Sequence, residues 1–357
     1  MSSSSARSRI ASSMANVMYT NAVYFPNYCI REGDTPGMLN YSCVNHVYYA
    51  YARVSEDGSV SLSDEWADAR APVDGAQGGL GSLMHLKQKN PHLQVVLSIG
   101  GGPAADVFPI VAGNASYRDN FGRSALGLVE ASGLDGVDIA WEYPSNSQQG
   151  IDLITLLAAI RIHLPQERFI LTAALPATRA ILQLIDFKIA ATYLDYVNLM
   201  AYNFFGPWSP KSGHHAQLYA MNKEETSGSS GVAHLMSHGF PAKKILLGIP
   251  THGRSFLNAA GPGQRFNGGG GEEGAFEYNQ LPRKGTREAV DKRHVAAQCI
   301  GGDGGFVTYD NAETVQTKAA FCKQKGLAGL FYWNAPADSK DKSRSLIAAG
   351  FRALHTS

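Results

Sequence analysis

The chain has 357 residues and a formal net charge of +1, with 44% hydrophobic and 17% charged residues. This composition is typical of a compact globular protein and excludes a strong electrostatic field that would attract nucleic acid or an anionic membrane. The length is too great for one average domain, but it suits a single α/β barrel with insertions.

The sequence begins MSSSSARSRIASSMANVMYTN, which is rich in serine and lacks the apolar segment of a signal peptide. We predict a disordered tail over residues 1–18. No segment approaches the ~18 to 20 apolar residues of a membrane-spanning helix. The localisation stays open between a chain that remains inside the cell and one whose leader was removed, although sequons at Asn40 and Asn114 slightly favour secretion.

Short β-branched and aromatic segments alternate with helical segments along the chain, which predicts a parallel sheet. Eight parallel strands close most naturally as a (β/α)8 TIM barrel. The expected strands are Ala22 to Phe25, Val44 to Ala52, Gln94 to Ile99, Gly136 to Glu142, Phe169 to Leu175, Tyr196 to Tyr202, Lys244 to Ile249 and Ala328 to Trp333.

The segment between the seventh and eighth strands is much longer than the other connections. We therefore expect strands 1 to 7 within residues 19–255, a small α+β insertion at 256–312, and a last helix-strand-helix unit at 313–357. Four consecutive glycines, Gly268 to Gly271, lie in the insertion. They follow no strand and precede no helix or Gly-Lys-Ser/Thr, so a flexible loop is favoured over a phosphate-binding loop.

Four cysteines are present, and they form no C-x-x-C pair. No histidines cluster at the sequence spacing of a metal site, so we predict neither a metal nor a cofactor. Two of the cysteines, Cys29 and Cys43, bracket the loop between the first two strands. A disulfide and two buried thiols are both compatible with that spacing. The other two are Cys299 and Cys322.

The fourth strand, LDGVDIAWEYP, carries the clearest chemical signal. Because strand side chains alternate, Asp138, Ala140 and Glu142 are expected on one face, toward the barrel interior. Glu142 stands at the C-terminal end, where barrel enzymes place their chemistry. A single acid there is more often a solvated or capping group. With Asp135 and Asp138 close by in a buried strand, however, desolvation is costly, and a functional site is favoured.

The segment DGVDIAWEYP resembles the family 18 chitinase signature D-G-x-D-x-D-W-E-Y-P, with Ala140 in place of the last aspartate. Other segments extend the resemblance over nearly the whole chain. They are NHVYYAYA in the second strand, LSIGG in the third, LMAYNFFG in the sixth, GIPTHGRSF in and after the seventh, and FVTYDNAETVQTKAAF and KGLAGLFYW toward the eighth.

This resemblance implies retaining hydrolysis of β-1,4-linked N-acetylglucosamine, in which the substrate's acetamido group replaces a protein nucleophile. It assigns proton donation to Glu142 and contact with the acetamido group to Tyr202. The residue at 140 would orient the acetamido N–H and balance positive charge, which Ala140 cannot do. Asp138 would share a proton with the missing carboxylate. Tyr24, Ser98 and Asp135 are implied to support this acidic network.

The resemblance also implies a sugar-binding surface with Trp333 as its hydrophobic floor, although a lone tryptophan is more often a core residue. Tyr51 and Met200 line the same pocket. Trp208 in the sixth loop either stacks on a neighbouring sugar or packs against protein, and the sequence leaves both readings open. The remaining expected substrate-binding residues are Gly101, Asn203 and Arg254.

Three positions depart from the family pattern. Asn203 replaces an aspartate, His252 replaces a tyrosine, and Gly102 replaces a frequent tryptophan. Asn203 can still hydrogen-bond a sugar hydroxyl. Loss of a stacking ring at Gly102 would weaken one subsite, and His252 makes the binding role of Arg254 less certain.

Three functions fit these features. The favoured one is a chitinase acting as a monomer on chitin or chitooligosaccharides, in which Ala140 was introduced to slow turnover, because the other catalytic positions are retained. The second is an inactive chitin-binding lectin, although retention of Glu142 argues against it. The third is an enzyme that cuts the chitobiose core of N-glycans, against which the W-E-Y-P segment and the insertion argue.

Overall fold

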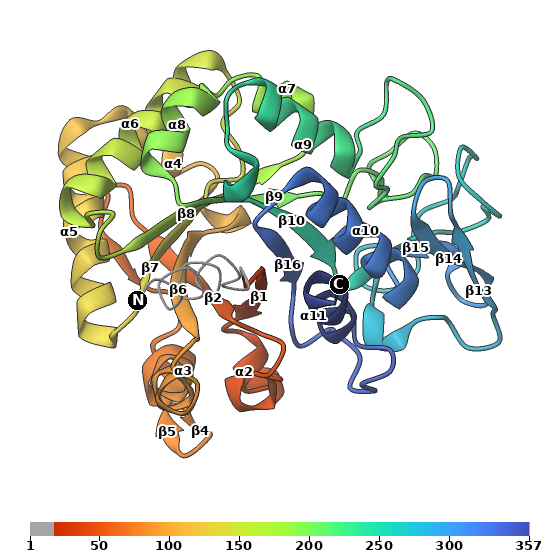
Figure 1. Cartoon of the computed structure of the whole chain (residues 1–357), viewed down its shortest axis with the longest axis horizontal. Helices are drawn as coiled ribbons and strands as arrows, with labels where there is room; N and C mark the ends of the chain where they lie inside the picture. Colours follow the sequence, from red (N-terminus) through yellow and green to blue (C-terminus); the bar gives the residue numbers. More distant parts are fainter. Residues whose placement is uncertain (1–17, 357) are drawn as a thin grey trace, which may run out of the picture.

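The computed structural model describes residues 18–356 and shows a closed parallel barrel, with strand order β1-β16-β10-β9-β8-β7-β6-β2 and closure by pairing of β1 with β2. The (β/α)8 fold expected from the sequence is therefore confirmed (Figure 1). The barrel strands are β1 (Thr20–Pro26), β2 (His46–Val54), β6 (Gln94–Gly100), β7 (Gly136–Ala140), β8 (Ile170–Pro176), β9 (Tyr196–Met200), β10 (Ile245–Pro250) and β16 (Gly329–Trp333).

Two strands end earlier than predicted. β7 stops at Ala140 because its last partner on β6 is Gly100, so residues 141 and 142 have no neighbouring strand to pair with. β9 stops at Met200, which pairs with Pro176. Ala177 N still donates to Met200 O, but no further residue pair follows. Glu142 and Tyr202 therefore lie in loops just above the barrel rather than within strands.

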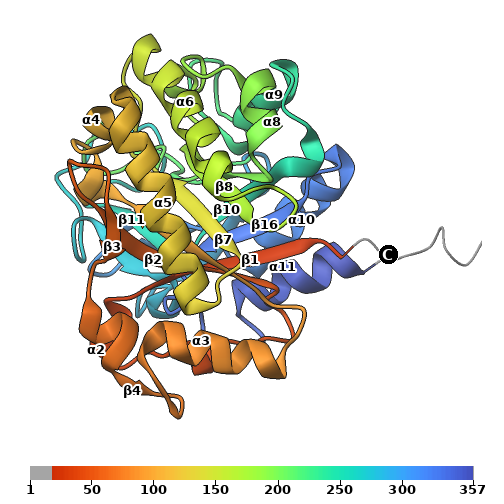
Figure 2. The same ribbon diagram turned by 90° about the vertical axis from the view of Figure 1, so that its left-hand side faces the viewer.

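Helices surround the barrel, with α5 and α6 side by side along its outer surface and in contact with each other (Figures 1 and 2). Asn114 caps α5 by accepting hydrogen bonds from the amides of Ser116 and Tyr117, and Gly133 ends that helix in a left-handed conformation. The helices are α2 (Cys29–Glu32), α3 (Gly78–Lys89), α4 (Phe108–Gly113), α5 (Ala115–Ser132), α6 (Ser147–His163), α7 (Arg179–Leu182), α8 (Phe187–Tyr193), α9 (Gly228–Ser237), α10 (Ala312–Lys325) and α11 (Leu346–His355).

Short elements complete the barrel loops. A hairpin strand, β3, pairs antiparallel with β2, and β4 pairs with β5 below α3 (Figure 1). These elements are β3 (Val60–Leu62), β4 (Pro72–Val73), β5 (Ala76–Gln77), the 3-10 turns Pro36–Met38, Gly102–Ala104 and Ala242–Lys244, and a π-helical turn at Trp66–Arg70.

The core has two layers because strand side chains alternate between the barrel interior and the surrounding helices. Tyr24, Tyr48 and Phe331 pack within the barrel. Trp141 faces the other way and stacks on Phe108, with ring centroids 5.6 Å apart. The tryptophan of the W-E-Y-P segment is therefore a packing residue. Its neighbours Ala140 and Glu142 lie on the side of the barrel interior, at the C-terminal end of β7.

The insertion is a five-stranded antiparallel sheet at the edge of the barrel, beyond α10 (Figure 1). It begins with β11, so it starts at His252 rather than at residue 256. Its only described helical turn is Tyr278–Gln280, and the helix α10 follows the last strand directly. In sheet order the strands are β12 (Ala275–Glu277), β11 (His252–Phe256), β15 (Gly305–Tyr309), β14 (Ala296–Gly301) and β13 (Glu288–Asp291).

The glycines Gly268 to Gly271 form an irregular loop beside β11. The loop is tied to that strand because Leu257 N donates to Gly268 O and Gly270 N donates to Ser255 Oγ.

The expected tail at residues 1–18 lies outside the described residues except for Met18. All four cysteines are buried free thiols, so the structure contains no bond between Cys29 and Cys43. No helix in the described part is both long and apolar enough to cross a membrane.

His46, the first residue of β2, is expected to make the fold sensitive to acid. Burial lowers its pKa to about 4, whereas an unfolded chain has a histidine pKa near ~6.5. Between these values the unfolded chain binds a proton and the folded chain does not, so stability falls as pH drops from about 6.5 to about 4. We expect His46 to contribute about 3 kcal/mol of this loss, because each pKa unit corresponds to about 1.4 kcal/mol. Urea unfolding of the original chain and of His46→Gln at pH 6.5 and pH 4 measures this contribution. An equal loss of unfolding free energy in the two proteins would contradict it.

Candidate active site

A row of polar side chains crosses the inside of the barrel on β6, β7 and β8. The strand register pairs Asp138 with Ser98 on one side and with Thr172 on the other. The hydroxyls of Ser98 and Thr172 each donate a 2.6 Å hydrogen bond to the Asp138 carboxylate, and the Tyr24 hydroxyl donates one of 2.8 Å. Asp138 has no exposed surface, so these donors replace its water.

Burial raises the pKa of Asp138, and the hydrogen bonds from Ser98, Thr172 and Tyr24 oppose that increase. Asn198 on β9 completes the network through Nδ2, which lies 2.8 Å from the Tyr24 hydroxyl and 3.4 Å from Asp138 Oδ1. Sequence reasoning missed Thr172 and Asn198. Each is a polar residue in an otherwise apolar strand, which is the signal that could have identified them.

Asp135 lies apart from this network. It precedes β7 at the opposite end of the barrel, where it accepts hydrogen bonds of 2.5 Å from Lys87 Nζ and 2.7 Å from the Val95 amide. The structure therefore does not bring Asp135 to Asp138, contrary to the expected supporting role. The physical reason is that the two residues stand at different heights on the strand.

Glu142 lies just beyond the C-terminal end of β7, two positions after the buried Ala140. Burial is the only resolved influence on the Glu142 carboxyl, and it raises the pKa above the ordinary value of 4.5. None of the described residues donates a hydrogen bond to this carboxyl group. The methyl group of Ala140 offers no polar partner, so Glu142 is a weakly acidic group with free hydrogen-bonding capacity.

The Tyr202 hydroxyl lies within electrostatic reach of both carboxyl groups. Burial raises its pKa first, and the charges of Tyr143, Glu142 and Asp138 raise it further. The hydroxyl therefore remains protonated and can donate a hydrogen bond. Tyr202 also contacts His252 edge-on, with ring centroids 6.1 Å apart.

Aromatic rings form a platform beside these groups at the C-terminal ends of β1, β2 and β16. Trp333 stacks against Tyr51, with centroids 5.7 Å apart and planes inclined by 25°. Its centroid is 5.5 Å from that of Tyr24. Met200 packs on the same cluster. All of Trp333, Tyr51 and Met200 are only partly buried, so part of their apolar surface remains available to a ligand.

Gly101 shapes this platform by close approach rather than by a side chain. Its φ is +79°, and a Cβ at this position would lie 2.7 Å from the Tyr51 ring. Only glycine fits both the conformation and the contact. The following Gly102 has open space where a larger side chain would stand.

Two of the three departures from the family pattern, Asn203 and His252, meet in one polar cluster. Asn203 Oδ1 accepts hydrogen bonds of 3.0 Å from His252 Nε2 and from Arg254 Nε. The Arg254 guanidinium lies 4.9 Å from the centroid of the Trp208 ring. Trp208 is 60% exposed, so its ring both packs against Arg254 and presents a face to solvent. Asn203 brings no negative charge to balance Arg254.

A separate pocket of about 450 Å³ lies between the segments 34–44 and 335–348, and its lining includes both apolar residues such as Met38 and Ile347 and charged residues such as Asp34 and Lys342. It contains none of the expected site residues. Glu142, Tyr202 and Trp333 instead lie at the C-terminal end of the barrel, on loops or strand ends that follow β7, β9 and β16.

The pKa of the Glu142 carboxyl group is raised, and no described residue donates a hydrogen bond to it. Together with the protonated Tyr202 hydroxyl and the aromatic platform, this group suits proton transfer to a carbohydrate. The fold and the site thus define a glycoside hydrolase type of barrel. The profile described as Glycosyl hydrolases family 18 matches residues 20–338. The chain belongs to this family.

Known proteins with similar sequences and structures agree with this assignment. Chitinase 1 of Aphanocladium album is 34% identical over 364 aligned positions, which cover 94% of this chain and 85% of that protein. The crystal structure of a GH18 chitinase from Cycas revoluta in complex with (GlcNAc)3 has a TM-score of 0.81 and 27% identity, covering 94% of this chain and 98% of that one. Group IV chitinase of Ostrinia furnacalis, with a TM-score of 0.85 and 23% identity, supports the fold.

Proposed function

We propose that this chain is a chitinase that binds chitooligosaccharides at the C-terminal end of the barrel and hydrolyses their β-1,4 linkages slowly. The observation that carries the proposal is the Glu142 carboxyl group, which burial makes a weaker acid, beside Tyr202 and the Trp333 platform. Family membership and chitinase relatives at 34% identity support the substrate class.

The proposed reaction proceeds in two steps with retention. In the first, Glu142 gives its proton to the glycosidic oxygen, the C1–O bond breaks, and the acetamido oxygen of the same sugar bonds to C1. The product is an oxazolinium ion and a released alcohol. In the second, the Glu142 carboxylate removes a proton from water while the water oxygen bonds to C1. The oxazolinium ring opens and the acetamido group is restored.

Ala140 is proposed to limit the first step. The attacking acetamido group becomes positively charged at nitrogen as its oxygen bonds to C1, and a carboxylate at position 140 would stabilise that charge. Asp138 does not replace it, because its carboxylate is fully buried and occupied by Tyr24, Ser98 and Thr172. Tyr202 remains as the hydroxyl that positions the acetamido oxygen.

Chitin tetramer is the substrate that tests this proposal. We expect the tetramer to bind, as measured by calorimetry, and to release chitobiose only slowly, as measured by chromatography. A high-mannose glycopeptide assayed in parallel tests the N-glycan alternative. Cleavage of the glycopeptide alone would overturn the proposed substrate.

Truncation of the aromatic platform is expected to weaken binding. Trp333→Ala removes on the order of 100 Å² of apolar contact with a sugar, worth about 2.5 kcal/mol at roughly 25 cal/mol per Å². We expect the tetramer Kd to rise about 10- to 100-fold. Calorimetry measures this change, and Trp333→Phe, which keeps an aromatic face, is the matched control. An unchanged Kd in Trp333→Ala would show that sugar binds elsewhere.

Trp208→Ala separates the two readings of the exposed loop tryptophan. If Trp208 stacks on a sugar, its removal weakens tetramer binding as well. If it only packs on Arg254, the Kd stays the same.

The lectin alternative makes a different prediction for the same protein. A lectin binds the tetramer without turnover, and restoring a carboxylate at 140 does not change that result. The source gene offers a further test of our proposal that Ala140 was introduced. An aspartate codon at 140 supports it, whereas an alanine codon favours the lectin alternative.

A further inference from the structure

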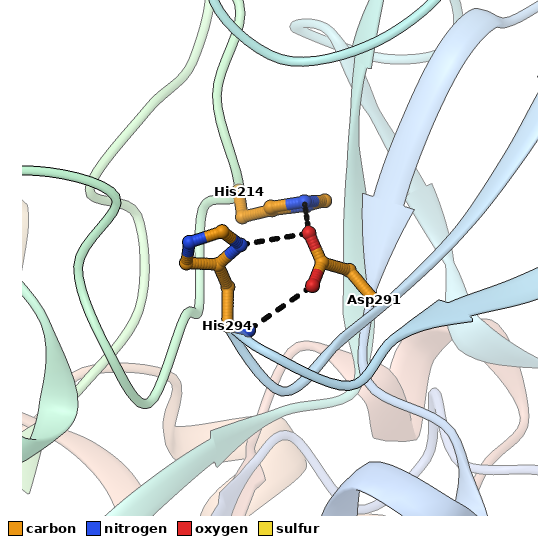
Figure 3. Close-up of side chains that lie close together, drawn as sticks. All are labelled: His214, Asp291 and His294. Carbon is orange, nitrogen blue, oxygen red and sulfur yellow. Dashed lines mark hydrogen bonds and ion pairs between the residues drawn. The ribbon is translucent and has the colours of Figure 1, made fainter.

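Three side chains outside the candidate active site converge between the insertion and the barrel. His214 lies in the loop after β9, Asp291 ends β13, and His294 lies in the turn that leads to β14 (Figure 3). One ligating atom from each lies within 4.8 Å of the other two. His294 Nδ1 is 2.7 Å from Asp291 Oδ2, and His214 Nε2 is 3.4 Å from the same oxygen.

The cluster is built around a buried nitrogen that lacks a hydrogen-bond partner. His214 has no exposed surface, and its Nε2 atom makes no aligned hydrogen bond despite its proximity to Asp291. Leaving such an atom unsatisfied typically costs ~1–3 kcal/mol. In Figure 3 Nε2 is directed toward the Asp291 oxygen that His294 also contacts, which points to a missing partner beside these three groups.

Neighbouring groups hold the ligating atoms in place, as outer-shell partners do in metal sites. His214 Nδ1, the other ring nitrogen, lies 2.9 Å from the Thr308 hydroxyl on β15. Asp291 Oδ1 accepts hydrogen bonds of 2.9 Å from the Arg293 amide and 3.1 Å from the His294 amide. These hydrogen bonds occupy His214 Nδ1 and Asp291 Oδ1. The other atom of each group, His214 Nε2 and Asp291 Oδ2, is therefore left on the side where the three residues meet.

We propose that His214, Asp291 and His294 bind a divalent transition-metal ion of the zinc type and that this ion fastens the loop after β9 to the insertion. Two imidazole nitrogens and one carboxylate oxygen are a common zinc ligand set, with a fourth position left for water. Asp291 is 26% exposed, which gives the ion and its water a route to solvent.

The nearby ammonium of Lys292 is directed to the surface, where it pairs with Glu313 at 3.7 Å.

Metal binding requires only a local adjustment. In a tetrahedral site with bonds of about 2.0–2.1 Å, neighbouring ligand atoms lie about 3.3 Å apart. The distance of 2.7 Å between His294 Nδ1 and Asp291 Oδ2 would have to increase. The largest distance between ligating atoms, which is at most 4.8 Å, would have to decrease. Rotation of the partly exposed Asp291 side chain is sufficient for shifts on the order of 1 Å.

Such an ion would order the loop that reaches the candidate active site. His215 follows His214 directly, and its Nδ1 lies 3.4 Å from the Asn203 amide. Its ring centroid is 5.2 Å from that of His252. The site is independent of the proposed hydrolysis, however, because none of its three ligands touches Glu142, Tyr202 or Trp333.

The test uses the full chain after chelator treatment and dialysis. We expect one equivalent of Zn²⁺ to bind in calorimetry, Co²⁺ to give visible absorption bands of a tetrahedral site, and Zn²⁺ to raise the melting temperature. Thr308→Val, which removes the outer-shell partner of His214, is expected to weaken binding about 10-fold. Asp291→Asn and His294→Gln, which remove ligands, are expected to weaken it more.

A second histidine pair supplies the control. His234 and His238 stack on α9 and just beyond it, with centroids 4.0 Å apart; His234 is partly buried and His238 is exposed. His238→Gln is expected to leave the single Zn²⁺ site unchanged. Absence of Zn²⁺ binding would show that the cluster is only a hydrogen-bonded network. Binding that survives both Asp291→Asn and His294→Gln, or that disappears in His238→Gln, would also overturn the proposal.

Discussion

Ala140→Asp is expected to raise the rate of chitin-tetramer hydrolysis by about 10²- to 10³-fold, because one preorganised charge-stabilising group typically has that effect. The added carboxylate would stand on the interior side of β7, between the buried Asp138 and Glu142, the proposed proton donor. There it would meet the acetamido nitrogen as positive charge develops. Steady-state release of chitobiose by both chains measures the change.

Ala140→Asn is the matched control for this variant. Asparagine has the shape of aspartate and can accept a hydrogen bond from the acetamido N–H, but it carries no negative charge. If charge is what position 140 supplies, Ala140→Asn recovers much less activity than Ala140→Asp. Equal rates in all three proteins would show that position 140 has no such role. Tetramer binding and thermal melting of each variant establish that the comparison is between folded proteins.

The restored carboxylate should also change how Asp138 titrates. Asp138 now has three hydroxyl donors and no acidic neighbour among the described residues that touch it. Two carboxylates in contact resist simultaneous ionisation, so the pair in Ala140→Asp would hold one proton to higher pH than Asp138 alone. The sequence alone predicted that positions 138 and 140 lie next to each other on one face of the strand, because strand side chains alternate with a period of two residues.

Alternation along a strand does not say where the strand ends, and this limited the sequence-based picture at Glu142 and Tyr202. Their strands stop at Ala140 and Met200 because the neighbouring strands offer no further partners. Pairing partners lie tens of residues away, so a local pattern cannot reveal them. The loop positions nevertheless bring Glu142 and Tyr202 together.

The sequence also did not predict how far along the barrel axis each residue lies. Asp135 and Asp138 are close in sequence, yet one bonds Lys87 at the bottom of the barrel and the other bonds Tyr24 in its interior. Thr172 and Asn198 join Asp138 from other strands, and their identification requires the register across the barrel. The cluster of His214, Asp291 and His294 depends on the docking of the insertion, which the spacing of histidines along the chain does not predict.

Glu142→Gln, introduced into the Ala140→Asp protein, is expected to abolish the restored activity while tetramer binding persists. General acid catalysis typically contributes ~10²- to 10⁴-fold, and the amide cannot protonate the leaving oxygen or activate water. Glutamine matches glutamic acid in shape, and Glu142 has no hydrogen bond to lose among the described residues. The variant should therefore fold and bind normally, as melting and calorimetry would show.

The pH profile distinguishes proton donation from a purely structural role of Glu142. Burial raises the pKa of Glu142 above 4.5, so its protonated form persists to higher pH than that of an exposed glutamate. The acid form is required for the first step, and the alkaline limb of kcat/KM in Ala140→Asp is therefore expected above that value, raised further by the new carboxylate nearby. Residual activity in the Glu142→Gln double variant should lack this limb. If the limb remained, another group would be the proton donor, and the role proposed for Glu142 would be wrong.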